Sequence, residues 1–293
     1  MFNGFDEWDL PVSPGGVTLH GRSGGSGPAV VLLHGHPRTH ATWHRVAPAL
    51  AALGFTVVCP DLRGYGRSAK PDPDPEHLVY SDRAMAADVA ALMATLGHDT
   101  FAVAGHDRGC GVAYRVAMDF PDQVAALAVC DGVPIAEALA RADAHFASRW
   151  WHWFFYGRSP HAHRVITADP LAWYRLEEFT MGAENYAYTV AAVTDPQCVL
   201  AMLEDYRAGL TADLDHARAD RDAGWKVRAA VLAMWSRHDD MEDLYGDPAA
   251  VWQPWCALPV DRAVIDSGHH MAEEAPDEVV AALEGMLAAV PRR

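Results

Sequence analysis

The chain alternates between short apolar runs and longer stretches with helical spacing. The runs that predict strands lie at residues 29–34, 55–59, 101–105, 124–130, 230–235 and 260–265. Most of them are apolar at nearly every position, as expected for strands that are covered on both faces. Helices are predicted at about residues 42–53, 81–96, 108–120, 248–255 and 277–289. Strands that alternate with helices imply a mostly parallel, doubly wound sheet.

The N-terminal segment has a different pattern. Residues 5–10 and 17–22 have the composition of two short strands, and the Ser-Pro-Gly-Gly sequence at 13–16 predicts a turn between them. We therefore expect two short strands joined by a turn at the start of the chain.

The alternation stops in the middle of the chain. From residue 134 to 223 there is no clear strand pattern, and aromatic side chains gather at 150–156. This segment is predicted to be a helical cap inserted into a core. The core would then consist of residues 1–133 and 224–293.

Composition and charge narrow the function. The 293 residues are enough for one large core, and the net charge of −16 argues against binding to nucleic acid or to an anionic membrane surface. No run approaches the ~18 apolar residues of a membrane span. The N-terminus lacks the pattern of an export signal, and the five cysteines are widely scattered. We expect a cytoplasmic protein with reduced thiols and a small-molecule substrate.

Gly105-His106-Asp107-Arg108-Gly109 joins a predicted strand to a predicted helix. Glycines two residues before and two residues after a central residue form the nucleophile elbow of the α/β-hydrolases. The central residue here is Asp107, a carboxylate that is ionised at pH 7 and needs no base to activate it. Such a nucleophile attacks an electrophilic carbon directly and forms an ester. This chemistry is suited to carbon–halogen bonds and epoxides.

Hydrolysis of that ester requires a base and an acid that orients it. His269 follows the last predicted strand and the loop glycine, and is preferred over its neighbour His270 as the base. Two positions are suitable for the acid: Asp131, and Asp239 or Asp240. The sequence does not choose between them.

Donors for the developing oxyanion are expected from backbone N–H groups. The N–H of Arg108 opens the helix after the elbow, and that of His36 lies in the turn His34-Gly35-His36-Pro37. The other histidines lack the cysteine or carboxylate spacing of a zinc site, and we expect neither a metal nor a cofactor.

Six motifs are distributed along the chain: His34-Gly35-His36-Pro37, Gly105-His106-Asp107-Arg108-Gly109, Asp131, His152-Trp153, Glu204-Asp205-Tyr206-Arg207 and Ser267-Gly268-His269. Together they resemble the fluoroacetate dehalogenase (haloacetate dehalogenase) family, whose members are α/β-hydrolases with a helical cap. The resemblance covers nearly the whole chain.

The resemblance implies a role for each matching residue. Asp107 would be the nucleophile, His269 the base and Asp131 its orienting acid, and Arg108 would hold the substrate carboxylate. The leaving halide would be received by His152, Trp153 and Tyr206, whose N–H and O–H groups are donors without a fixed charge. The lid resemblance further implies a homodimer.

One departure from the family pattern concerns the second arginine, which would lie one helical turn after Arg108. That position is Gly111. Losing one charge-assisted hydrogen bond costs about 1.5–3 kcal/mol. We hypothesise that Arg38 compensates, in which case replacing Arg38 raises the Michaelis constant for haloacetates. Alternatively, the substrate is larger or uncharged.

Three functions follow from these residues. The first is hydrolytic dehalogenation of small haloacids of the fluoroacetate type. The second is epoxide hydrolysis with the same Asp–His–Asp apparatus and Tyr206 as the acid in the lid. The third is a receptor that binds its ligand without turning it over.

Overall fold

An eight-stranded sheet forms the centre of the computed structural model, which describes residues 1–12 and 16–288. The strands are β1 (Phe5–Val12), β2 (Val17–Gly25), β3 (Ala29–Leu33), β4 (Thr56–Pro60), β5 (Phe101–His106), β6 (Val124–Cys130), β7 (Ala230–Ser236) and β8 (Val260–Ile265). Their order across the sheet is β1-β2-β4-β3-β5-β6-β7-β8. β2 is antiparallel to β1 and to β4, and every later pair is parallel. The predicted mostly parallel sheet is confirmed.

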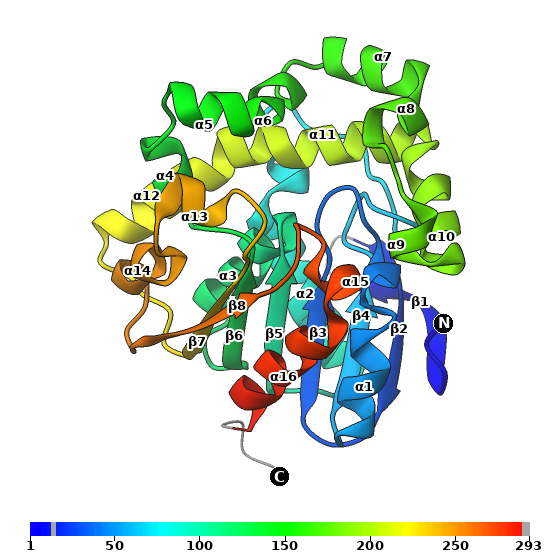
Figure 1. Cartoon of the computed structure of the whole chain (residues 1–293), viewed down its shortest axis with the longest axis vertical. Helices are drawn as coiled ribbons and strands as arrows, with labels where there is room; N and C mark the ends of the chain where they lie inside the picture. Colours follow the sequence, from blue (N-terminus) through cyan, green and yellow to red (C-terminus); the bar gives the residue numbers. More distant parts are fainter. Residues whose placement is uncertain (13–15, 289–293) are drawn as a thin grey trace.

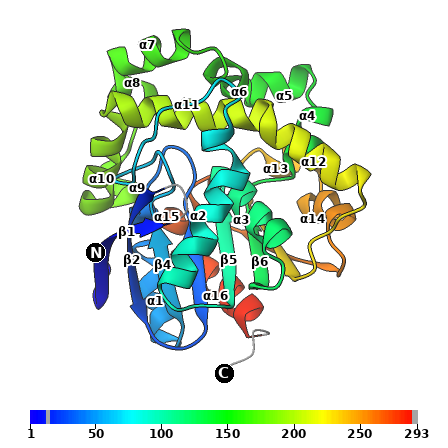
Figure 2. The same cartoon turned by 180° about the vertical axis from the view of Figure 1, so that it is seen from behind.

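Helices cover both faces of the sheet (Figures 1 and 2). α2 (Asp82–Thr95) and α3 (Arg108–Asp119) lie on one face, and α1 (Val46–Ala52) and α16 (Pro276–Leu287) lie on the other. The parallel strands are buried on both sides for this reason, which explains why their sequences are apolar without alternation.

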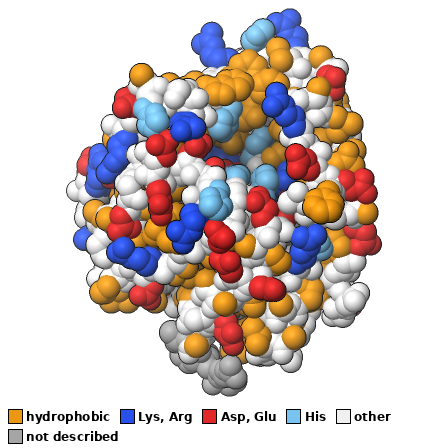
Figure 3. Space-filling model, viewed as in Figure 1, with side chains coloured by type: hydrophobic (Ala, Val, Ile, Leu, Met, Phe, Trp, Pro, Cys, Tyr) orange, Lys and Arg blue, Asp and Glu red, His pale blue; other side chains and the backbone are white. Residues whose placement is uncertain are grey.

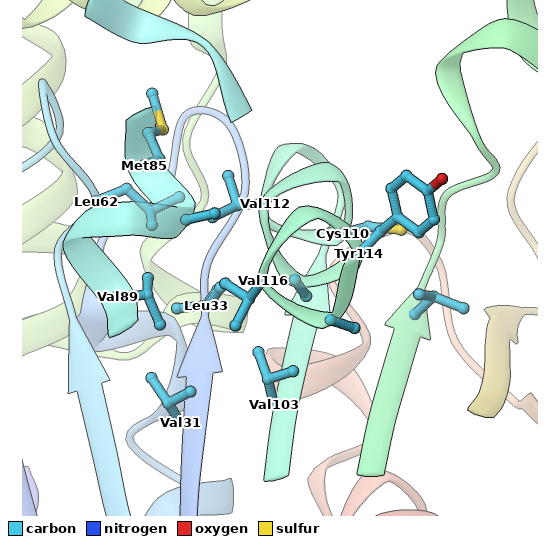
Figure 4. Close-up of a cluster of buried hydrophobic side chains, with 14 of the residues drawn as sticks. Val31, Leu33, Leu62, Met85, Val89, Val103, Cys110, Val112, Tyr114 and Val116 are labelled. Atoms are coloured by element: carbon cyan, nitrogen blue, oxygen red, sulfur yellow. The ribbon is translucent and has the colours of Figure 1, made fainter. Parts of the chain in front are cut away.

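Successive residues of one strand pack into different cores. In β3, Val31 and Leu33 point toward α2 and α3, whereas Val30 and Leu32 point toward α1 and α16. Figure 4 shows the first of these cores, with Val31 and Leu33 beneath side chains of the two helices such as Val112. The elbow after β5 is thus anchored by a helix that is itself packed on the sheet.

Two predicted helices are shorter than expected. The segment predicted at 42–53 is a 3₁₀ helix at His40–Trp43 followed by α1, and that predicted at 248–255 is α14 (Pro248–Trp252) followed by a 3₁₀ turn. Pro48 is the third residue of α1, a position where its missing N–H removes no intrahelical bond, so the helix begins late. Residues 13–15 of the predicted turn and the last residue of the helix predicted at 277–289 lie outside the described residues.

Nine helices follow β6 and precede β7 in the described chain. They are α4 (Ile135–Ala140), α5 (Ala144–Arg149), α6 (Trp151–Tyr156), α7 (His161–Ala168), α8 (Pro170–Tyr174), α9 (Glu178–Met181), α10 (Ala183–Val193), α11 (Pro196–Leu210) and α12 (Ala212–Asp222). We call them the lid helices, because α6 and α11 lie above the carboxyl ends of the parallel strands (Figure 1). The boundaries between core and cap at 133/134 and 223/224 stay a prediction. None of the helices described has both the length and the apolar character needed to cross a membrane.

Candidate active site

Asp107 occupies a sharp turn between β5 and α3. Its φ of 52° and ψ of −118° lie outside the regions that non-glycine residues favour. A Cβ at Gly105 would lie 2.0 Å from the carbonyl oxygen of Gly109, so this close approach of the backbone requires a glycine. The turn places the Asp107 carboxylate above the sheet edge.

The Asp107 carboxylate is held by two different neighbours. Its Oδ1 accepts a hydrogen bond from the backbone N–H of His36 at 2.7 Å. Its Oδ2 lies 3.7 Å from Nε2 of His269. Burial acts to raise the pKa of Asp107, but these neighbours, above all His269, hold it well below its usual range. Asp107 is therefore ionised and has Oδ2 free for attack.

His269 lies between two carboxylates. Its Nδ1 is hydrogen bonded to Oδ2 of Asp239 at 2.7 Å, on the side opposite Asp107. Burial acts to lower the pKa of His269, but Asp107 and Asp239 raise it well above its ordinary value. The reciprocal interaction holds the pKa of Asp239 below its usual range although burial acts in the opposite direction. These three residues form an Asp–His–Asp line across the ends of β5, β7 and β8.

Asp131 is close to this line but is not the hydrogen-bond partner of His269. Its Oδ2 is 3.9 Å from His269 Nδ1. Its two oxygens accept hydrogen bonds from the backbone N–H of Ser236 at 2.7 Å and from the Ser236 hydroxyl at 2.6 Å. The expected contact from Asp131 is therefore made by Asp239, because Ser236 at the end of β7 holds the Asp131 carboxylate.

The two remaining candidates near the base have other environments. Asp240 lies 3.7 Å from Arg149 of α5 and has no contact with His269. His270 is in ring contact with His269, and burial lowers its pKa well below the ordinary value, so it stays neutral. Neither residue reaches the carboxylate of Asp107.

Lid residues enclose the space above Asp107. His152 and Trp153 come from α6 and Tyr206 comes from α11, and all three line the same cavity as Asp107. The Tyr206 ring centroid lies 5.2 Å from that of His36 and 6.2 Å from those of His152 and Trp153. Burial lowers the pKa of His152 to about 4, so it is a neutral donor at pH 7. The predicted halide-binding residues are thus brought together.

Tyr156 is a cavity residue that the sequence reasoning did not identify. Its ring centroid lies 4.8 Å from that of Tyr206, and burial raises its pKa to about 12, so it keeps its proton. Tyr156 lies four residues after His152 on α6, a spacing that places both on one helix face. The four-residue spacing from His152 was the sequence signal that could have identified Tyr156 as a cavity residue.

Arg108 lines the cavity, but its guanidinium is already paired. Nε and Nη2 both donate to Oδ1 of Asp205, at 2.9 Å for Nε, and Nη2 also donates to the Asp205 carbonyl at 3.0 Å. Oδ1 of Asp82 lies 3.8 Å from Nη2, and the guanidinium lies over the Tyr206 ring. Much of the charge expected to bind a carboxylate is therefore neutralised within the protein.

Arg38 does not line the cavity. Its Nε and Nη2 donate to the two oxygens of Glu273 at 3.0 and 3.1 Å, and both side chains are buried. The hypothesis that Arg38 replaces the missing arginine at Gly111 is not supported by this geometry. Arg38 is instead held by the carboxylate of Glu273, 235 residues later in the sequence, because a buried carboxylate requires a counter-charge.

The cavity that contains these groups has a volume of about 770 Å³. Figure 3 shows a hollow between the core and the lid helices, with histidine side chains at its edge. This volume is in the range of pockets for drug-sized ligands, roughly 300–1,000 Å³. A two-carbon acid would fill only a small part of it.

Two clusters in the described residues have ligand atoms close enough to hold a metal ion. His20, His40 and Asp61 form one, but Asp61 already accepts hydrogen bonds from His40 and from the backbone N–H of Arg67. The other, formed by His106, Asp131 and His269, coincides with the proposed base.

Comparisons with known proteins agree with this architecture. Residues 28–276 match the model of the alpha/beta hydrolase fold family. The chain is 39% identical to a fluoroacetate dehalogenase of Burkholderia sp over 98% of this chain and 95% of that protein. It is 32% identical to a soluble epoxide hydrolase of Corynebacterium sp. strain C12, over 90% and 92%. The solved structure of the epoxide hydrolase CorEH superposes with a TM-score of 0.85 at 30% identity, over 98% and 100%.

Proposed function

The chain belongs to the α/β-hydrolase family, and we propose that it cleaves the carbon–halogen bond of small halo-carbonyl compounds, of which haloacids are the simplest. The observation that carries this proposal is the ionised Asp107 facing both His269 and a lid that supplies uncharged donors. The relationship to a fluoroacetate dehalogenase along nearly the whole chain supports it.

In the first step Oδ2 of Asp107 attacks the carbon that bears the halogen. The carbon–oxygen bond forms as the carbon–halogen bond breaks, and the halide leaves with the bonding electron pair. His152, Trp153 and Tyr206 line the cavity and receive the halide through N–H and O–H donors. Fluoride in particular is small and strongly hydrated, so several donors are needed to replace its water.

In the second step water hydrolyses the ester. Alkylation removes the negative charge of Asp107, one of the two charges that raise the pKa of His269. His269 then gives up its proton more readily and becomes the base that deprotonates water. Water attacks the Asp107 carboxyl carbon, and the His36 N–H that now binds Oδ1 stabilises the oxyanion. Collapse returns Asp107 and releases an alcohol, so that the net reaction consumes one water and yields one halide and one proton.

We assign the orientation of the base to Asp239, on the 2.7 Å hydrogen bond to His269 Nδ1. Asp131 contributes negative charge at 3.9 Å and is fixed by Ser236. Both carboxylates favour the imidazolium that forms when His269 accepts the proton of water.

Epoxide hydrolysis is the second candidate, and the pairing of Tyr156 with Tyr206 favours it. In that reaction a phenol O–H protonates the oxygen of the ring as Asp107 attacks its carbon. The 32% identity to a soluble epoxide hydrolase is a further reason to test it.

A product panel distinguishes these candidates. Fluoride and chloride release is measured with fluoroacetate, chloroacetate and their amides, and diol formation is measured with a small epoxide. Asp107→Asn is the blank for spontaneous reaction. Halide release that requires Asp107 supports the first proposal, and diol formation without halide release supports the second. Turnover of neither, with a ligand still raising Tm, indicates a receptor.

A further inference from the structure

A recess of the cavity lies beside Gly111, one helical turn after Arg108. A Cβ at Gly111 would lie 2.5 Å from Oδ2 of Asp82, which is the first residue of α2. The side chain that Gly111 lacks is therefore replaced by a carboxylate from a neighbouring helix. Gly111, Asp82 and Arg108 all line the cavity.

Some polar atoms near Gly111 lack hydrogen-bond partners, although the backbone N–H of Asp82 donates to Oδ1 of Asp213 at 2.9 Å. Among the described residues, Oδ1 of Asp82, Oδ2 of Asp213 and the hydroxyl of Tyr114 are buried and unpartnered. Asp82 is 7% exposed and Asp213 is 3% exposed, and both line the cavity together with Tyr114. Buried polar groups are normally hydrogen bonded, so three unpartnered ones at one cavity wall point to a ligand that supplies the partners.

The recess presents a donor and an acceptor side by side. Nη2 of Arg108 lies 3.8 Å from Oδ1 of Asp82, and Arg108 directly follows the nucleophile. Both side chains line the same cavity as Asp107, so a substrate held at Asp107 can extend a carbonyl group toward them.

We infer that this site recognises a carboxamide rather than a carboxylate next to the halogenated carbon. The inference rests on the proposed dehalogenation at Asp107 and specifies its substrate class. The amide carbonyl oxygen accepts from Nη1 of Arg108, because Nε and Nη2 already donate to Asp205, and the amide N–H donates to Oδ1 of Asp82.

Charge decides against the simpler alternatives. A substrate carboxylate has only acceptor oxygens and would meet the carboxylates of Asp82 and Asp205 around a single guanidinium. A substrate ammonium has only donors and would offer no acceptor to the N–H groups of Arg108. A neutral amide has one acceptor and up to two donors, and so satisfies both neighbours without an unpaired charge. The cavity also leaves room for a substituent on the amide nitrogen.

The test compares 2-fluoroacetamide with fluoroacetate on the intact protein by fluoride release. We expect a higher kcat/KM for the amide in the unmodified protein. Asp82→Asn removes the charge that repels the acid, so it should lower the ratio of amide to acid by about tenfold or more, chiefly through KM. Asp99→Asn, which removes an exposed charge at the opposite end of the sheet, should leave the ratio unchanged.

A second measurement does not depend on the Asp82 variant. Acetamide and acetate are tested as inhibitors of the unmodified protein, and acetamide should compete more strongly. Preference for the acid, or a ratio that Asp82→Asn leaves unaltered, would overturn the inference while leaving dehalogenation intact. Absence of fluoride release from both compounds, together with diol formation from an epoxide, would instead reject the proposed function.

Discussion

The buried pair of Arg38 and Glu273 provides a test of whether this arginine binds substrate or stabilises the fold. Arg38→Ala removes both hydrogen bonds to Glu273, whose side chain is 0% exposed. Glu273 keeps its hydrogen bonds from Thr42 at 2.9 Å and from Asn185 at 2.8 Å. Its charge would nevertheless have no cationic partner.

The size of the effect follows from that unpaired charge. Breaking a buried ion pair by removing one partner costs about 3–5 kcal/mol. For a domain of this length, each kcal/mol lowers Tm by about 2 °C, so the expected loss is about 6–10 °C. Because Arg38 does not line the cavity, the Michaelis constants for fluoroacetate and 2-fluoroacetamide should be unchanged.

The assay combines thermal unfolding with steady-state fluoride release, measured well below the Tm of the variant. Glu273→Gln is the matched single variant and should also lower Tm. Replacing both residues with methionine should restore much of the loss, because no buried charge remains. A raised Michaelis constant with an unaltered Tm would refute this reasoning and return Arg38 to the substrate site.

Three further predictions concern the reaction centre and its neighbour Asp82. His269→Gln should permit attack but not hydrolysis, so mass spectrometry should find the Asp107 peptide carrying the alkyl group; an unmodified peptide after incubation with a true substrate would reject the covalent route. Asp239→Asn should lower kcat by about 10²-fold or more, whereas Asp131→Asn should lower kcat less, and the reverse order in single-turnover rates would make Asp131 the orienting acid. Burial raises the pKa of Asp82 from 3.8 to about 6, so Asp82 lowers stability as pH rises through this window. Asp82→Asn should therefore match the unmodified protein near pH 4 and gain stability above pH 6, by at most ~3 kcal/mol; a Tm difference that is constant from pH 4 to 8 would contradict this.

The sheet was predictable because its signal is local. Each apolar run by itself indicates a strand that is buried on both faces. The elbow is a five-residue motif in which the close approach of the backbone requires glycines. The helix boundaries near Pro48 were missed because the proline shifts the helix start within an otherwise favourable pattern. The fold class could be predicted because it follows from the order of strands and helices along the chain, without knowing which strands pair with each other.

The choice of the acid was not predictable for a geometric reason. Asp131 and Asp239 follow the neighbouring parallel strands β6 and β7, so both are brought to the same edge of the sheet. They differ by little more than 1 Å in distance to His269, and Ser236 determines that difference by holding Asp131. The sequence identifies the edge of the sheet at which the orienting acid lies, but hydrogen bonds within the loops decide which of the two carboxylates contacts His269.

Substrate charge was the least predictable property, because it depends on which charges cancel inside the protein. The sequence shows Arg38 and Arg108 near the site, and counting them favours an anionic substrate. In the structure Glu273 pairs with the first and Asp205 with the second, and each partner comes from a distant segment. Removing those two charges from the count leaves the carboxylate of Asp82 as the unpartnered group nearest to Arg108. This carboxylate repels an acid, whereas a neutral amide donates to it and also offers a carbonyl oxygen to Arg108; for this reason the amide, rather than the acid, is the substrate to test first.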